Sequence, residues 1–342
     1  GLIASANYLG YLIGALAAAW IRLPGGARRW FLSALVVSFV TTGAMALADS
    51  MALYLAIRFA SGVASAFVLV LASTLVLARV TAAGRQGLFS LHFAGVGSGI
   101  AISAVLVASM AAAGFDWRSF WLAGGFLAAL AWFAALMLVP GQSDDQVAAV
   151  PPGESNGRLG SPVRMLILSY GLFGFGYVIL GTFISAMVRD TPDIQALESS
   201  IWLIVGLAGI PSVAVWTWVA KRWGYGFSYA VAAVTQAAGT AISILATAPA
   251  VVIGAITLGG TLVGLTAIGL VHARNLTQHD PRLVLGLMTG SFGAGQIAGP
   301  LFAGFVSDAT GTLTIPLLGA AVALLGCAVL TPEPMPRPVP VG

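Results

Sequence analysis

Long apolar runs follow one another along almost the whole chain. We find eleven, and each is about 20 or more residues long, enough to cross a hydrocarbon core of about 30 Å as a helix. They are too long for the strands of a membrane barrel, which span about 10 residues and alternate in polarity. We therefore expect an all-α membrane protein with helices near residues 2–20, 30–48, 51–78, 87–113, 119–139, 163–188, 198–219, 226–247, 250–271, 283–307 and 313–330.

The composition excludes a soluble globular protein. Of the 342 residues, 59% are hydrophobic and only 8% are charged, whereas soluble domains carry about 25% charged residues. The net charge of +4 is a small surplus that does not indicate a nucleic-acid partner. Cys327 is the single cysteine, which excludes an intrachain disulfide and a cysteine metal cluster. His92, His272 and His279 lack HExxH spacing, and Ser98 lacks a GxSG context, so we expect no enzyme, no cofactor and no metal site.

Basic residues gather in alternate loops. Of the fifteen Lys and Arg residues, Arg118 and Arg189 lie in one set of loops and Arg58 lies inside a run. The other set, together with the C-terminal tail, holds Arg22, Arg28, Arg29, Arg79, Arg85, Arg158, Arg164, Lys221, Arg222, Arg274, Arg282 and Arg337. Because Lys and Arg mark the cytoplasmic side of short loops, we expect a multi-pass protein of the bacterial inner (cytoplasmic) membrane with a cytoplasmic C-terminus.

Two sequence features recur at one spacing. The basic turn at Arg22 has a counterpart at Lys221, an offset of 199 residues (221 − 22), and Gly95 has a counterpart at Gly293, an offset of 198 (293 − 95). This offset equals six helices, which is the sign of an internal repeat. Applied to the run at 163–188, it requires a helix ahead of Gly1. We expect a protein of twelve helices, arranged as six plus six, of which the first is missing here.

The repeat defines an expected domain organisation. Residues 1–139 form an N-terminal bundle that corresponds to helices 2 to 6 of the full fold, and 162–330 form a C-terminal bundle of helices 7 to 12. The segment 140–161 is polar and rich in Pro, Gly and Ser, which is typical of a flexible cytoplasmic linker. The tail 331–342 contains five prolines and is expected to be extended and flexible.

Local motifs agree with this organisation. The fourth helix of the full fold contains Arg58-x-x-Ser61-Gly62-x-Ala64-x-Ala66, and further motifs are Ser5-Ala6-Asn7-Tyr8-Leu9-Gly10-Tyr11, Tyr170-Gly171-Leu172-Phe173-Gly174-Phe175-Gly176-Tyr177 and Gly293-Ala294-Gly295-Gln296-Ile297-Ala298-Gly299-Pro300. With these motifs the whole chain resembles the major facilitator superfamily of secondary transporters, and within it the YbfB/YjiJ-type branch. The resemblance implies a fold of two six-helix bundles and secondary transport, but it does not name a substrate.

Arg58 is the full charge that falls inside an apolar run, about seven residues from its start. Ionisable groups inside a membrane are costly, by about 2.5 to 3.5 kcal/mol on insertion scales, and each is therefore a functional candidate. The planar guanidinium suits a carboxylate or a phosphate, so we expect Arg58 to bind a small organic anion or a carboxylate in the missing helix. The alternative is that Arg58 extends to the outer interface or contacts a helix carbonyl.

The other candidate substrate-binding residues are polar or aromatic. Small residues at GxxxG spacing, such as Gly95 and Gly99, are explained by close helix packing. In the run 163–188, however, glycines alternate with aromatic residues, which suggests a flexible helix that lines a cavity. We expect substrate contacts from Tyr170, Phe175 and Tyr177, and also from Asn7, Tyr11, His92 and Gln296. A buried, hydrogen-bonded His92 is the simpler alternative, and His272 is expected at the membrane interface.

These features favour a secondary active transporter that moves a small molecule by alternating access. The expected partners are this substrate, the lipid bilayer and protons, and the expected state is a monomer. Proton coupling usually relies on a buried carboxylate or histidine, but Asp49, Asp116, Asp190, Asp193, Glu198 and Asp308 all lie at or beyond helix ends. The alternatives are a uniporter or efflux carrier of the same fold, and a channel or receptor that does not transport.

Overall fold

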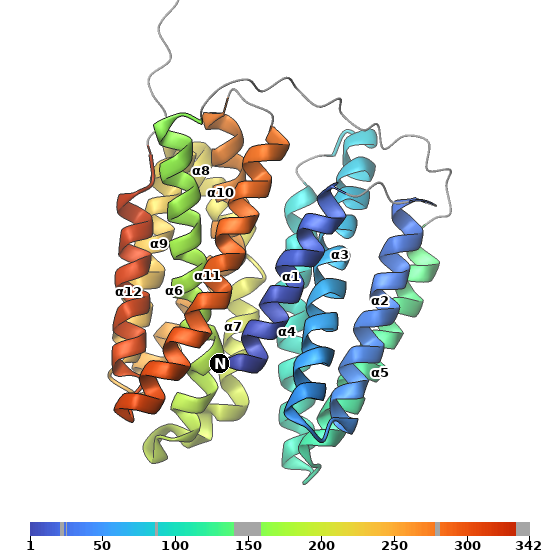
Figure 1. Cartoon of the computed structure of the whole chain (residues 1–342), viewed down its shortest axis with the longest axis vertical. Coiled ribbons are helices and arrows are strands. Elements are labelled where there is room, and N and C mark those ends of the chain that lie inside the picture. Colours follow the sequence, from blue (N-terminus) through green and yellow to red (C-terminus); the bar gives the residue numbers. More distant parts are fainter. Residues whose placement is uncertain (21–23, 25, 86–87, 140–158, 278–280, 333–342) are drawn as a thin grey trace, which may run out of the picture.

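The computed structural model describes all residues except 21–23, 25, 86–87, 140–158, 278–280 and 333–342 (Figure 1). Every regular element in the described part is a helix. The α-helices are α1 (Leu2–Trp20), α2 (Ala27–Ala44), α3 (Met51–Ala82), α4 (Phe89–Ala112), α5 (Trp117–Leu138), α6 (Ser161–Arg189), α7 (Glu198–Gly209), α8 (Ser212–Trp223), α9 (Tyr225–Ser243), α10 (Ala248–Leu276), α11 (Pro281–Thr310) and α12 (Thr314–Val329), with short 3-10 turns η1 (Met45–Leu47) and η3 (Pro192–Leu197).

One expected helix is broken. The run 198–219, predicted as a single helix, is divided into α7 and α8 at Ile210 and Pro211. Proline lacks the amide hydrogen of the helical ladder, and its ring collides with the carbonyl of the preceding turn, so the helix is interrupted there. Together η3, α7 and α8 still form one apolar span, Pro192–Trp223. The prediction of one continuous helix was wrong, while each of the other predicted runs corresponds to one helix in the described residues, so there are eleven helical units when α7 and α8 are counted together.

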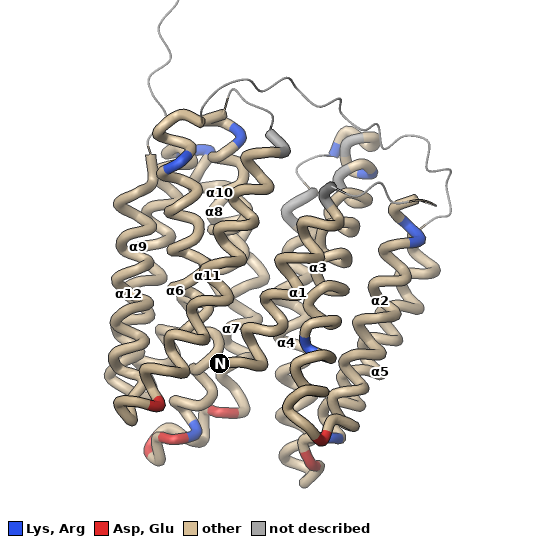
Figure 2. Tube along the Cα trace, in the orientation of Figure 1, with Lys and Arg blue, Asp and Glu red and all other residues tan. Residues whose placement is uncertain are grey.

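Length and composition support a membrane protein. In the described part of the chain, seven helical segments are long and apolar enough to cross a membrane, and Leu2–Ala18 and Thr314–Val329 are shorter apolar helices. Figure 2 shows the described Lys and Arg residues gathered mainly at one end of the helices and Asp and Glu at the other. We name these the basic end and the acidic end. Their separation matches the charge asymmetry of the loops.

The helices form two groups that lie side by side (Figure 1). In the N-terminal group, α3 packs against α1 and α2, and α2 packs against α5. In the C-terminal group, α6 packs against α11 and α12, and α10 packs against α7, α8 and α9. The groups meet where α1 contacts α11 and where α4 contacts α7. Helix α6 begins at Ser161, inside the expected linker; the expected domain boundaries stay a prediction, because 140–158 and 333–342 lie outside the described residues.

Glycines allow some of the helices to approach closely, but not all those with GxxxG spacing do so. Gly10 of α1 lies against the backbone of Phe59, and Gly62 of α3 lies against the backbone of α1. In contrast, a Cβ added to Gly95 or Gly99 would meet nothing within 4 Å. Helix α4 contacts α7 through Gly97, which stands between Gly95 and Gly99 in the sequence. Gly97 lies against the backbone around Gly209. The packing role expected for Gly95 and Gly99 was therefore wrong.

Candidate functional site

Arg58 lies on α3, where that helix is held closely against α1. The side-chain amide of Asn7 donates a hydrogen bond of 2.9 Å to the backbone carbonyl of Arg58. This bond and the glycine contacts fix the two helices together near the charge. Among the described residues no carboxylate lies within 4.0 Å of the Arg58 side chain. The ion pair that the described part of the chain does contain joins two other residues, Arg189 and Glu198. Arg58 is thus a half-buried cation that the described chain leaves without an acidic partner.

Tyr8 connects Arg58 to the C-terminal helices. Its ring packs against the buried core of the C-terminal group. Its phenol lies within electrostatic range of the Arg58 guanidinium and beside Thr182 of α6. The sequence prediction did not include Tyr8 or Thr182 among the candidate residues. The available signal for Tyr8 was its place next to Asn7, one helical turn before Tyr11 on the same face of α1.

Gln296 and Tyr177 form the C-terminal side of the site. The amide nitrogen of Gln296 on α11 donates a hydrogen bond to the hydroxyl of Tyr177 on α6. Gln296 is 5% exposed, and its amide oxygen has no hydrogen-bond partner within the described structure. Tyr177 also lies within electrostatic range of Tyr8 and Tyr11. Four helices, α1, α3, α6 and α11, therefore bring a cation, several phenols and an unused amide oxygen to the junction of the two groups.

Two other predicted residues serve the interior of the C-terminal group. Tyr170 is 2% exposed, and its hydroxyl donates to the carbonyl of Thr266 at 3.3 Å. Phe175 packs against Phe302 of α11, with 5.5 Å between ring centres. The glycines of α6 serve close packing, because Gly174 lies against Phe292 of α11. Helix α6 is continuous from Ser161 to Arg189, so it is not broken; its expected flexibility stays a prediction.

His92 does not join the others. Its Nε2 lies 3.1 Å from the hydroxyl of Ser73, which links α4 to α3. Ser73 is fifteen residues (73 − 58) beyond Arg58 on α3, so the two positions are separated by about 22 Å along the helix. His272, expected at the interface, is only 1% exposed, and its Nε2 lies 2.8 Å from the carbonyl of Pro332. His272 lies near the end of α10, where the chain after α12 covers it, and its place at the membrane interface stays a prediction.

The described residues contain no group of three or more His, Cys, Asp or Glu side chains that could hold a metal ion. The chemistry available at the junction is therefore that of a guanidinium, phenols and an amide. Such groups bind and orient a polar molecule through charge and hydrogen bonds. They do not form a nucleophile and base of the kind that covalent catalysis requires.

Two adjacent groups of apolar helices with a half-buried charge near their junction have the arrangement of a multi-pass transporter of the major facilitator class, a family of transporters and not of enzymes. A family profile described as "Uncharacterised MFS-type transporter YbfB" matches residues 1–331. The chain belongs to this family, and the resemblance of its motifs is confirmed. None of the curated proteins searched matches the sequence.

A solved structure shows the same fold. The crystal structure of the human organic anion transporter MFSD10 (TETRAN) superimposes with a TM-score of 0.68 and 18% sequence identity. The alignment covers 97% of this chain and 83% of that chain. At this level of identity the likeness concerns the fold alone. It agrees with the two-bundle architecture of the major facilitator superfamily.

Proposed function

We propose that the protein is a secondary active transporter that moves a small organic anion by alternating access, with Arg58 as the group that binds the anionic part. The observation that supports this is the half-buried Arg58 beside Tyr8, with no acidic partner within 4.0 Å among the described residues. A guanidinium offers five donors in a planar fork that matches a carboxylate or a phosphate. A bound anion would balance this charge in the low dielectric of the membrane.

The residues of the C-terminal group would bind the part of the substrate that does not contact Arg58. The unused amide oxygen of Gln296 accepts a hydrogen bond, and the Tyr177 hydroxyl beside it is held in place by the amide nitrogen. Tyr8 and Tyr11 add phenols from the N-terminal group. A substrate bound in this way contacts both groups of helices at once. That is the arrangement on which alternating access depends, since one bundle rocks against the other around the substrate.

The contact of α4 with α7 suits a pivot for this movement. Gly97 lies against the backbone of Gly209 and Ile210, where the span of α7 and α8 is interrupted. Such a backbone-to-backbone contact brings the two helices close together without side chains between them. The printed name of MFSD10 describes an organic anion transporter, and for this chain that name supports the proposed substrate class without identifying a substrate.

Orientation and coupling belong to the same proposal. The basic end faces the cytoplasm of a bacterial inner membrane, since Lys and Arg are retained on that side. In intact cells, Asp193→Cys at the acidic end should react with an impermeant maleimide, whereas Arg79→Cys should react only after lysis. We propose protons as the coupling ion, because His92 is a histidine inside an apolar span, and intramembrane histidines are residues through which pumps and transporters relay protons. Uptake driven by an imposed pH gradient, and its loss in His92→Gln, would support this.

Purified protein in liposomes provides the test of transport. Counterflow of labelled lactate, succinate or benzoate should be saturable in the wild type, which separates a carrier from a channel or a receptor. Arg58→Ala should reduce counterflow about 100-fold or more, because a charge-assisted, bidentate contact is lost. Arg58→Lys keeps the charge but loses the fork, and should retain partial activity. Arg79→Ala, a change of an exposed arginine on the same helix, is the matched control. Normal counterflow by Arg58→Ala would refute the proposal.

A further inference from the structure

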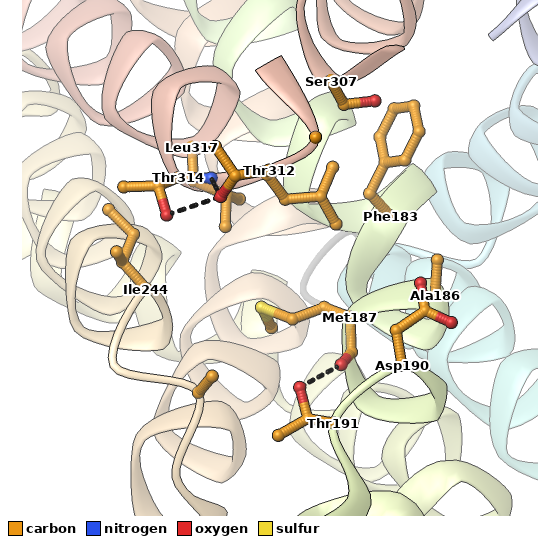
Figure 3. Close-up of a pocket in the computed structure, with 13 residues that line it drawn as sticks. Phe183, Ala186, Met187, Asp190, Thr191, Ile244, Ser307, Thr312, Thr314 and Leu317 are labelled. Carbon is orange, nitrogen blue, oxygen red and sulfur yellow. Dashed lines mark hydrogen bonds between the residues drawn. The ribbon is translucent and has the colours of Figure 1, made fainter.

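A cavity lies at the acidic end of the C-terminal group, and Arg58 is not among the residues that line it. Its volume is about 490 Å³, within the range of about 300 to 1,000 Å³ that is usual for small-molecule sites. Its walls come from three places, the end of α6, the turn between α9 and α10, and the turn between α11 and α12. In Figure 3, Phe183, Ala186 and Met187 of α6 and Asp190, the residue that follows α6, lie on one side of this space, and Thr312, Thr314 and Leu317 lie on the other.

The floor of the cavity is apolar and its rim carries one charge. Leu317 is 2% exposed and Met187 is 7% exposed, so both are fixed in the core, and Phe183 extends the apolar wall. Asp190 is the ionisable residue among those that line the cavity, and it is exposed to a ligand. An apolar floor with a single carboxylate at the rim is complementary to a molecule with an apolar body and one positive charge.

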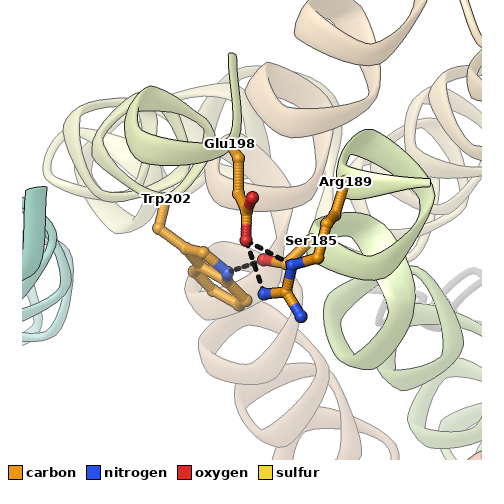
Figure 4. A network of polar contacts seen from close by, with 4 residues as sticks. All are labelled: Ser185, Arg189, Glu198 and Trp202. Atoms are coloured by element: carbon orange, nitrogen blue, oxygen red, sulfur yellow. Dashed lines mark hydrogen bonds and ion pairs between the residues drawn. The ribbon is translucent and has the colours of Figure 1, made fainter. Parts of the chain in front are cut away.

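The neighbouring arginine lies within electrostatic range of Asp190 but forms its direct ion pair with another residue. Arg189 is turned toward Glu198, with 2.5 Å between Nη2 and the carboxylate and 2.7 Å from Nε. Figure 4 shows this pair next to the hydrogen bond of 2.8 Å from the Trp202 indole to Ser185, which ties α7 to α6. Among the described residues no cation lies within 4.0 Å of the Asp190 carboxylate, which is exposed and so accessible to a ligand.

The hydroxyl groups of the cavity are suited to accept hydrogen bonds. Thr191 donates its hydrogen to the carbonyl of Met187 at 2.8 Å, and Ser307 donates to the carbonyl of Gly304 at 3.3 Å. Thr312 donates to the hydroxyl of Thr314 at 3.0 Å and accepts the backbone amide of Thr314 at 3.2 Å. Because the hydrogens of Thr191 and Ser307 are already used, their oxygens offer lone pairs. A ligand that supplies hydrogen-bond donors fits this rim better than one that supplies acceptors.

We infer that this cavity binds a primary organic ammonium with an apolar body, its nitrogen at Asp190 and its apolar part against Phe183 and Leu317. Such a group is found in free alkyl- or arylamines and in aminophospholipid headgroups. The inference is independent of the proposed transport of anions. The two sites use different residues of α6, since Thr182 lies beside Tyr8 whereas Phe183, Ala186 and Met187 line the cavity.

Three water-soluble probes of one shape test the site: phenethylamine, 2-phenylethanol and 3-phenylpropionate. Calorimetric titration of the full chain in phosphatidylglycerol nanodiscs should show that the amine binds at least about tenfold more tightly than the alcohol and the acid, as a charge-assisted hydrogen bond predicts. Asp190→Asn should remove this preference, and Asp308→Asn, a change of an exposed acid outside the cavity lining, should keep it. Ile244→Trp fills the cavity from the turn and should weaken binding of all three probes.

Nanodiscs of phosphatidylethanolamine separate the two sources of the ammonium group. Weaker phenethylamine binding in these discs would assign the site to the lipid headgroup, and equal binding would assign it to free amines. Equal affinity for the three probes, or an unchanged preference in Asp190→Asn protein that melts like the wild type, would overturn the inference.

Discussion

The two groups of helices differ in how much of their apolar surface they bury. In the most apolar window of both α6 and α10, 56% of the residues are buried, whereas the value is 6% in α5 and 18% in α3. The C-terminal group has a continuous core that includes the fully buried Leu166, Ile179 and Leu265. The N-terminal group has a smaller cluster around Phe31 and Phe67. The N-terminal helices therefore direct most of their apolar side chains outward, where a membrane protein meets lipid.

This difference assigns different tasks to the two groups. The charge of the candidate site, Arg58, belongs to the loosely packed group, while Gln296 and Tyr177 are fixed in the tightly packed one. Close-packed interiors change shape little, whereas loosely packed helices can shift against them. We expect the C-terminal group to act as a frame and the N-terminal group to carry the charge toward it and away from it. The contacts between the groups should then be the most sensitive places in the molecule.

The largest structural effect is expected where the groups meet at α4 and α7. Gly97→Ala places a methyl group against the backbone of Gly209 and Ile210, and overpacking of this kind costs about 1 to 3 kcal/mol. Gly95→Ala, two residues away, has open space around the new methyl group, and replacing glycine in a helix stabilises it by about 0.5 to 1 kcal/mol. Melting of the purified variants should therefore shift in opposite directions. Equal melting temperatures would show that the groups do not meet at Gly97.

This pair also shows what the sequence can and cannot predict. Helix positions follow from the length of apolar runs, so α1 and α12 begin and end within one residue of their predicted bounds. Arg58 stands out because a charge in an apolar run is costly. Spacing alone does not reveal which glycine faces a neighbour, since this depends on how α4 is rotated against α7. The break at Pro211 was missed although proline gives a local signal, and Tyr8 was missed because its position beside Arg58 depends on the contact of α1, α3 and α6.

A smaller effect should distinguish two buried amides. Gln236 of α9 is 0% exposed, and neither of its amide atoms has a hydrogen-bond partner in the described structure. An unsatisfied buried polar group costs about 1 to 3 kcal/mol, so Gln236→Leu should raise the melting temperature and leave counterflow unchanged. Gln296→Leu removes the bond to Tyr177 at the junction, and should reduce counterflow more than it changes melting. If Gln236→Leu lowered stability, the core of the C-terminal group would depend on a polar contact at that residue.

The smallest effect is expected at the acidic end of the N-terminal group. Asp116 precedes α5, and its carboxylate accepts hydrogen bonds from the backbone amide of Ser119 at 2.9 Å and from the Ser119 hydroxyl at 2.7 Å. These bonds, with a small contribution from Arg118, lower the pKa of Asp116 below its ordinary value of 3.8. Because the pKa of Asp116 is lower in the folded state, its carboxylate stabilises the fold. This stabilisation is fully present above the pKa of the unfolded state and is lost as the pH falls through the pKa of the folded state.

The melting difference between the wild type and Asp116→Ala should therefore be constant from pH 7 to about pH 5 and shrink below about pH 4. It should be small throughout, because the carboxylate is exposed and water competes for its hydrogen bonds. Melting of Asp193→Ala measured over the same pH range is the matched reference, because Asp193 is an exposed acid of the C-terminal group. A melting difference that grows on acidification would mean that protonated Asp116 stabilises the start of α5 better than the carboxylate does. The carboxylate would then not be the stabilising cap of α5.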